Sequence, residues 1–210
     1  MKPYVFGVRN NVHIIDVEKT AEKLKEVSDF ILQIISKNGT ILFLGTKPQV
    51  QAALKREAIR CGCPYINERW LGGFLTNFGV VSRLIKKYKD LVKRRDSGDL
   101  IKYTKKEQLE FEKEIKRLYK LIGGVLDLEK LPDAIFVWDI KKEKTGVKEA
   151  LKKKIPIIAI CDTNVNITGI DHVIPANDDA TKTIELLLPF IADCVLEAKK
   201  AAEEKKVEKK

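Results

Sequence analysis

Short apolar runs alternate with longer amphipathic stretches in this sequence, and that alternation limits the choice of folds more than any other feature. Apart from His13 and Asp16 in the first run, the runs contain no charged or strongly polar residue, which is typical of strands buried on both faces. The runs lie at residues 12–16, 41–45, 65–66, 134–138, 155–160 and 173–174. Strands of this kind, separated by helices, predict an α/β fold with a parallel sheet covered on both sides and right-handed crossovers.

The stretches between the runs have the periodicity of helices. Leu24, Val27, Ile31 and Ile34 form one apolar stripe. Asn177 is a suitable capping residue for the start of a last helix. These stretches supply the helices that a covered parallel sheet requires.

Residues 77–122 interrupt this alternation. Apolar residues from Phe78 to Val92 form one seam, and those from Phe111 to Ile122 recur at coiled-coil spacing. We therefore predict an antiparallel coiled-coil hairpin inserted into the sheet domain. The predicted organisation is an α/β core at 1–76 and 123–197, a hairpin at 77–122, and a basic tail at 198–210 that is mobile in the free protein.

The net charge of +10 is concentrated in two parts of the chain. Residues 83–122 carry 14 Lys and Arg against 7 Asp and Glu, and residues 198–210 carry 6 Lys against 3 Glu. The remaining residues carry 20 charges of each sign. A neutral core with basic appendages is the distribution expected of a protein that binds a polyanion.

An enzymatic alternative comes from three aspartates, each at the carboxyl end of a predicted strand. Asp16, Asp139 and Asp162 could form a magnesium-dependent phosphotransfer pocket, but an aspartate in this position also often caps the next helix. Neither standard phosphate-binding glycine motif occurs. We expect no enzyme, no catalytic residue, no metal and no cofactor, and keep this enzyme and a coiled-coil adaptor as the alternatives.

The sequence also predicts a compartment. No run of about 18 apolar residues occurs, and the N-terminus lacks an apolar signal region. Without such a signal, the four cysteines are expected to be reduced thiols. These features predict a cytosolic protein.

Four blocks of sequence resemble, in order, segments of the bacterial and organellar small-subunit ribosomal protein S2 family. They are MKPYVFGVRNNVHIIDVEKT, TILFLGTKPQVQAALKREAIRCGCPYINERWLGGFLTNF, LPDAIFVWDIKKEKTGVKEALKKKIPIIAICDTN and DHVIPANDDA. The resemblance implies a flavodoxin-like, doubly wound α/β/α domain with a protruding coiled-coil hairpin. The family usually has a further N-terminal segment before the Met-Lys-Pro with which this sequence opens; either the protein starts earlier than this sequence or the lineage has lost the segment, so its rRNA contacts are not carried over.

The resemblance also implies a function and partners. Members of the family are structural proteins of the small subunit, bound to 16S-type rRNA in cytoplasmic or organellar ribosomes. The implied partners are this rRNA and neighbouring small-subunit proteins, including the large mRNA-binding ribosomal protein one. No membrane and no functional homo-oligomer are expected.

RNA binding of this kind needs Lys and Arg side chains that meet phosphates and release counterions. In the shoulder, residues 68–78, Arg69 offers a guanidinium and Trp70 an indole that could pack on a base or sugar. An ion pair with Glu68 and packing in the core are the alternatives for these two residues. The predicted RNA-binding residues are Lys2, Arg9, Asn10, Lys47, Arg69, Trp70, Asn77, Lys93, Arg94, Arg95, Lys102, Lys105, Lys106 and Lys141.

Overall fold

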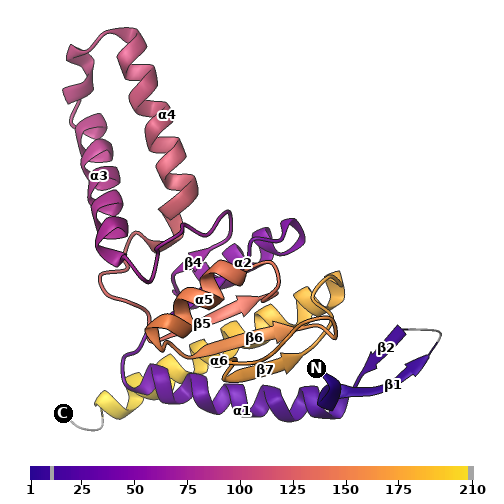
Figure 1. Ribbon diagram of the computed structural model, residues 1–210. Helices are drawn as coiled ribbons and strands as arrows, with labels where there is room; N and C mark the ends of the chain where they lie inside the picture. Colours follow the sequence, from indigo (N-terminus) through magenta and orange to yellow (C-terminus); the bar gives the residue numbers. More distant parts are fainter. Residues whose placement is uncertain (10–11, 208–210) are drawn as a thin grey trace.

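A central sheet of five parallel strands organises the chain (Figure 1). The computed structural model describes residues 1–9 and 12–207. The strands are β3 (Ile41–Leu44), β4 (Tyr65–Ile66), β5 (Ala134–Trp138), β6 (Ile157–Cys161) and β7 (His172–Pro175). Their order is β4-β3-β5-β6-β7, which is the flavodoxin-like order counted from β3, with a topological switch point between β3 and β5. The prediction of a doubly wound parallel sheet is confirmed.

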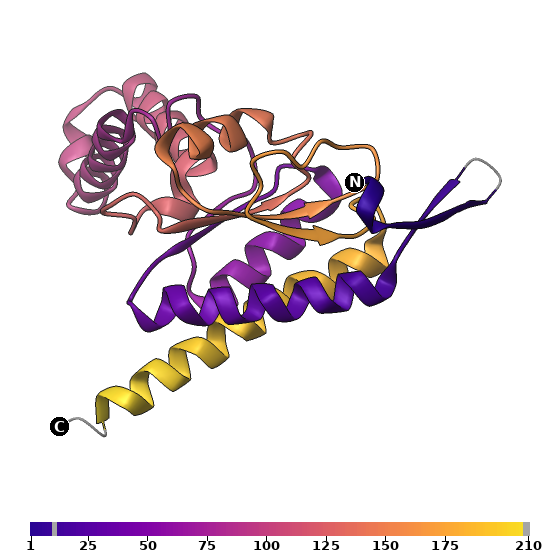
Figure 2. The same ribbon diagram turned by 60° about the horizontal axis from the view of Figure 1, so that its bottom comes forward.

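Helices cover both faces of this sheet (Figure 2). On one face lie α1 (Val17–Ser36), α2 (Pro48–Cys61) and α6 (Thr181–Val207), and on the other lies α5 (Lys144–Lys153). Side chains of β3 alternate between the two cores, with Phe43 in the first and Leu44 in the second. Burial on both faces explains why the central strands are apolar at every position.

One predicted strand lies outside the sheet. Residues 12–16 do not form a buried parallel strand, because β2 (Val12–Ile15) pairs antiparallel with β1 (Val5–Arg9) in a two-stranded hairpin that projects from the domain (Figures 1 and 2). Val12 is 65% exposed. The adjacent β1 pairs with the backbone of β2, so β2 needs no place in the central sheet. Asp16 then caps α1 by accepting from the backbone N–H groups of Glu18 and Lys19.

Two helices, α3 (Phe78–Asp96) and α4 (Lys105–Ile122), lie side by side between β4 and β5 and project from the sheet (Figure 1). Leu91, Ile115 and Leu118 are buried between them. The short helix η2 (Asp99–Lys102) joins them at the far end, and Thr104 begins α4 with a capping box. The insertion thus carries its own small apolar core.

The last helix continues past the predicted start of the tail. Residue 198 falls inside α6, where Ala198 is still buried. The Nζ of Lys199 donates to the backbone carbonyls of Cys61 and Gly62 at 2.7 and 3.1 Å, at the end of α2. The packing of Ala198 and these bonds hold the first residues of the predicted tail against the end of α2. All four cysteines are buried and free.

No helix within residues 1–9 and 12–207 has the length and apolar character needed to span a membrane.

Candidate nucleic-acid interface

The shoulder is held by one buried carboxylate on α5. Oε1 of Glu149 accepts from the indole N–H of Trp70 at 3.0 Å and from the N–H of Gly73 at 2.7 Å. Oε2 accepts from the backbone N–H groups of Leu75 and Thr76 at 2.9 and 3.2 Å. Burial by itself raises the pKa of Glu149, but these hydrogen bonds outweigh it and hold the pKa below its ordinary value.

Close packing also fixes the shoulder. The ring of Trp70 lies 5.0 Å from that of Phe74. A Cβ on Gly146 of α5 would come within 3.2 Å of the Trp70 ring and 2.7 Å of Cδ2 of Leu44, so only glycine lets α5 approach so closely. Trp70 is only 8% exposed, so it packs in the core, which was the alternative to RNA binding for this residue. Little of its ring surface is left for contact with a base.

Arg69 points outward beside this buried tryptophan. Its side chain is exposed, and it forms no ion pair with any described residue. Its neighbour Glu68 instead lies 3.4 Å from the Nζ of Lys120 on α4. The shoulder therefore presents a guanidinium to solvent, which is the arrangement that phosphate contact requires.

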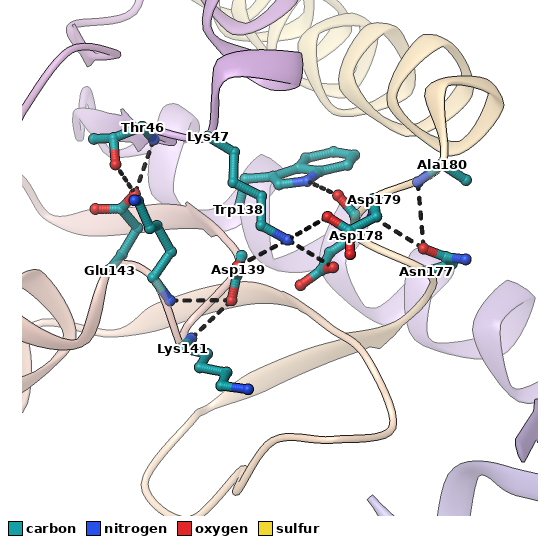
Figure 3. Close-up of polar contacts among 11 residues, drawn as sticks. Thr46, Lys47, Trp138, Asp139, Lys141, Glu143, Asn177, Asp178, Asp179 and Ala180 are labelled. Carbon is teal, nitrogen blue, oxygen red and sulfur yellow. Dashed lines mark hydrogen bonds and ion pairs between the residues drawn. The ribbon is translucent and has the colours of Figure 1, made fainter.

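A cluster of charges occupies the switch point between β3 and β5 (Figure 3). The Nζ of Lys47 lies 2.9 Å from Asp139, 2.9 Å from Asp178 and 2.8 Å from Asp179. Burial lowers the pKa of Lys47, but these hydrogen bonds outweigh burial and raise it above its usual value. Burial raises the pKa of Asp178, and the hydrogen bond from Lys47 partly offsets this. The indole N–H of Trp138 donates to the carbonyl of Asp178 at 3.0 Å.

This cluster bears on two sequence-based expectations. Three carboxylates surround the one ammonium of Lys47, so the local charge is negative and does not favour a phosphate. The three aspartates of the magnesium alternative have separate roles: Asp139 pairs with Lys47, Asp16 caps α1, and Asp162 accepts from the N–H of Thr163. In the part of the chain that the structure describes, no three His, Cys, Asp or Glu side chains are placed to hold a metal.

The far end of the helical pair carries the basic tip: Lys93, Arg94, Arg95, Lys102, Lys105 and Lys106. Tyr103 organises part of it. Its hydroxyl accepts from Arg94 at 2.9 Å, and the Arg94 guanidinium and the Lys102 ammonium lie 6.0 and 5.9 Å from its ring centre. The ring in turn packs edge-on against Phe111. Tyr103 thus joins two cations of the tip to the helical pair.

The other tip cations differ in their availability. Arg95 pairs with Asp96 at 2.8 Å. Lys93, Lys105 and Lys106 are exposed, and none has an ion pair within residues 1–9 and 12–207. These three ammonium groups are free to meet an external anion.

Comparison with known protein families agrees with this architecture. The family model described as ribosomal protein S2 matches residues 1–198, which is nearly the whole chain. The chain belongs to the ribosomal protein S2 family. Membership makes it a small-subunit ribosomal protein that takes part in translation within a ribonucleoprotein particle. The S2 family is typically structural rather than enzymatic.

The remaining residues of the predicted S2-family interface lie apart from one another. Arg9 is exposed at the end of β1, Asn77 is exposed immediately before α3, and Lys141 is exposed after β5. Lys2 lies in the short helix η1 (Lys2–Tyr4). Asn10 lies outside the described residues. The described candidates thus fall into the shoulder, the basic tip, the N-terminal segment with Lys2 and Arg9, and the switch-point edge of the sheet with Lys47 and Lys141.

Sequence reasoning missed two residues that position the interface. Glu149 lies on the buried face of α5 between Val147 and Ala150. A charged residue at an apolar position of a helix was the signal that could have revealed it. Tyr103 gave no such signal, because its role depends on contacts across the turn between two helices.

Proposed function

We propose that this protein is a structural constituent of the small ribosomal subunit, which binds 16S-type rRNA through basic surfaces and supports subunit assembly and translation. The observation that carries the proposal is a group of cations at the far end of a projecting helical pair, Lys93, Lys105 and Lys106, which have no ion-pair partner among the described residues. Membership of the S2 family supports rRNA as the polyanion that this surface binds. Phosphate contacts with counterion release then provide most of the affinity.

The helical pair serves as an antiparallel coiled coil that holds the basic tip away from the sheet. The 19 residues of α3 span about 28 Å at the usual rise of an α-helix. Leu91, Ile115 and Leu118 keep the two helices together. The length of the pair lets the tip reach RNA that the sheet domain does not touch.

The other predicted contacts divide by their surroundings. Arg69, Arg9 and Lys141 are exposed and meet phosphates near the sheet domain. Lys47 and Trp70 act within the protein, since three carboxylates hold the first and the core encloses the second. Shoulder and tip thus contact separate stretches of rRNA.

Neighbouring small-subunit proteins, including ribosomal protein one, are the proposed protein partners. Phe6 and Val8 on the projecting β1–β2 hairpin are 79% and 60% exposed. Exposed apolar side chains on a projecting segment support a protein contact. The protein acts as one copy on a cytoplasmic or organellar ribosome, without a membrane.

Charge reversal at the tip tests the rRNA proposal. The triple variant Lys93→Glu, Lys105→Glu, Lys106→Glu should bind small-subunit rRNA more weakly in filter-binding titrations at two salt concentrations. The slope of log affinity against log salt should fall by about one unit for each phosphate that the variant no longer binds. The matched control, Lys25→Glu, Lys148→Glu, Lys152→Glu, changes the net charge equally on the sheet domain. The proposal would be contradicted if both triple variants lost rRNA affinity equally. Affinity that does not depend on salt concentration would also contradict it and would favour a coiled-coil adaptor.

A further inference from the structure

A cavity of about 350 Å³ opens beside the switch point and has no role in the fold described so far. Three segments line it: the end of β3, the shoulder, and the turn between β5 and α5. The lining residues are Thr46, Glu68, Arg69, Trp70, Lys142, Glu143 and Thr145. Open parallel sheets bind ligands at this edge, outside the carboxyl ends of the strands at the switch point.

Glu143 brings a buried carboxyl group to this cavity. The residue is only 3% exposed, and its Oε1 accepts from the N–H and the hydroxyl of Thr46 at 2.8 and 2.6 Å. Its Oε2 has no hydrogen-bond partner in the described part of the chain, and Figure 3 shows this oxygen pointing away from Thr46. Burial raises the pKa of Glu143, while the Thr46 donors lower it in part. No buried side-chain nitrogen or oxygen of the described residues lacks a partner, so this oxygen reaches the solvent of the cavity, where a ligand hydroxyl can donate to it in place of water.

Positive groups surround the same opening. Arg69 and Lys142 are exposed, and neither forms an ion pair with any residue that the structure describes. The one other carboxylate of the lining, Glu68, is already paired with Lys120. The ten-residue helix α5 also starts here, and no side chain caps its first N–H groups. An anionic group at the opening would meet two cations and the positive end of a helix.

We propose that this cavity binds a ribose 5-phosphate unit, with a sugar hydroxyl donating to Oε2 of Glu143 and the phosphate contacting Arg69 and Lys142. The 2′-hydroxyl is a donor that RNA has and DNA lacks. A carboxylate also binds the ribose hydroxyl in other nucleotide-binding sheets. Trp70 is buried and offers no free ring face, so sugar and phosphate fit better than a stacked base.

The unit can belong to an RNA strand or to a free nucleotide. The first source rests on the proposed rRNA-binding function, whereas the chemistry of the cavity is common to both. A bound strand would be read as RNA through its 2′-hydroxyl, without base recognition.

The indole signals of the two tryptophans provide a direct test. Trp70 lines the cavity, whereas Trp138 donates to Asp178 within the salt-bridge cluster. In a ¹H–¹⁵N spectrum of the full chain, ribose 5-phosphate should shift the Trp70 indole peak saturably and the Trp138 peak less. It should bind about threefold to tenfold more tightly than 2-deoxyribose 5-phosphate, as expected for one hydrogen bond. The 2-fluoro sugar cannot donate and should bind like the deoxy sugar.

Variants assign the contacts. Glu143→Leu should abolish the preference for ribose, and the 2-fluoro sugar tests the same bond in the unaltered protein if this variant does not fold. Lys142→Ala should weaken all three sugars by about the same factor, because it removes a phosphate contact. Lys148→Ala on the same helix is the control and should change nothing.

A single-stranded ribopentanucleotide then identifies the source. If the pentanucleotide shifts the Trp70 peak at a lower concentration than ribose 5-phosphate does, the source is an RNA strand. If only ribose 5-phosphate shifts the peak, the source is a free nucleotide. The proposal would be overturned if the Trp70 peak did not move or if the three sugar phosphates bound with equal affinity. It would also be overturned if the Lys142→Ala variant bound them as tightly as the unaltered protein does. If rRNA binding still depended on Lys93, Lys105 and Lys106, only the cavity would be rejected and the rRNA-binding function would stand.

Discussion

Glu149 accepts a hydrogen bond from the indole N–H of Trp70 at 3.0 Å, across 79 positions of the chain. This contact joins α5 to the shoulder, and the same carboxylate also receives three backbone N–H groups of that segment. The shoulder leads directly into α3. A side chain of the sheet domain thus fixes the root of the helical pair that carries the basic tip.

Glu149→Ala is expected to destabilise the fold strongly. The change leaves an indole N–H and several backbone N–H groups of the shoulder buried without an acceptor, at a cost of about 3 kcal/mol or more. Urea unfolding followed by far-ultraviolet circular dichroism measures the destabilisation. Lys148→Ala, at the neighbouring exposed position, should stay within about 0.5 kcal/mol of the unaltered protein. Equal midpoints for the two variants would show that the shoulder does not depend on this carboxylate.

The same residue predicts a dependence of stability on pH. The pKa of Glu149 is lower in the folded protein than the ordinary value of 4.5. Its stabilising contribution is therefore complete above that ordinary pKa and is lost as pH falls through the lower folded pKa. Unfolding free energies measured between pH 7 and pH 3 should fall less steeply for Glu149→Gln than for the unaltered protein. Parallel curves would contradict a lowered pKa for Glu149.

The predictable part of the fold is the part that burial alone determines. The runs at 41–45, 134–138 and 155–160 were identified because strands buried on both faces need apolar side chains at every position. The run at 12–16 also contains three β-branched apolar residues, but His13 stands among them, and β2 is an exposed hairpin strand. The apolar residues alone do not separate the two cases, since the difference depends on which neighbour the strand pairs with.

The candidate site shows the same limit. The excess of Lys and Arg in residues 83–122 is visible in the sequence because it needs only a count. The partners of Lys47 and Trp70 are not visible, since Asp178 lies 131 positions from the first and Glu149 lies 79 positions from the second. These long-range contacts decide that both candidates serve the protein interior.

Gly146→Ala and Gly79→Ala should have opposite effects, although both glycines lie in helices. A Cβ at Gly146 would come within 2.7 Å of Leu44 and 3.2 Å of Trp70, so overpacking should cost about 1–3 kcal/mol. A Cβ at Gly79 meets nothing within 4 Å, so the gain in helix propensity should stabilise by up to about 1 kcal/mol. Thermal unfolding of both variants compares the signs, and stabilisation by Gly146→Ala would reject the close approach of α5.

Lys47→Met should destabilise the sheet edge in a pH-dependent way. Its removal leaves Asp139, Asp178 and Asp179 without their shared cation, and an unpaired buried charge costs about 3–5 kcal/mol. The pKa of Asp178 is already raised by burial, and removal of Lys47 raises it further. Because a raised carboxyl pKa favours the protonated form in the folded state, the penalty should shrink as pH falls below that pKa. Urea unfolding at pH 7 and pH 4.5 measures the loss of stability, with Lys141→Met as the control at an exposed lysine. An equal loss at both pH values would mean that the carboxylates do not repel one another.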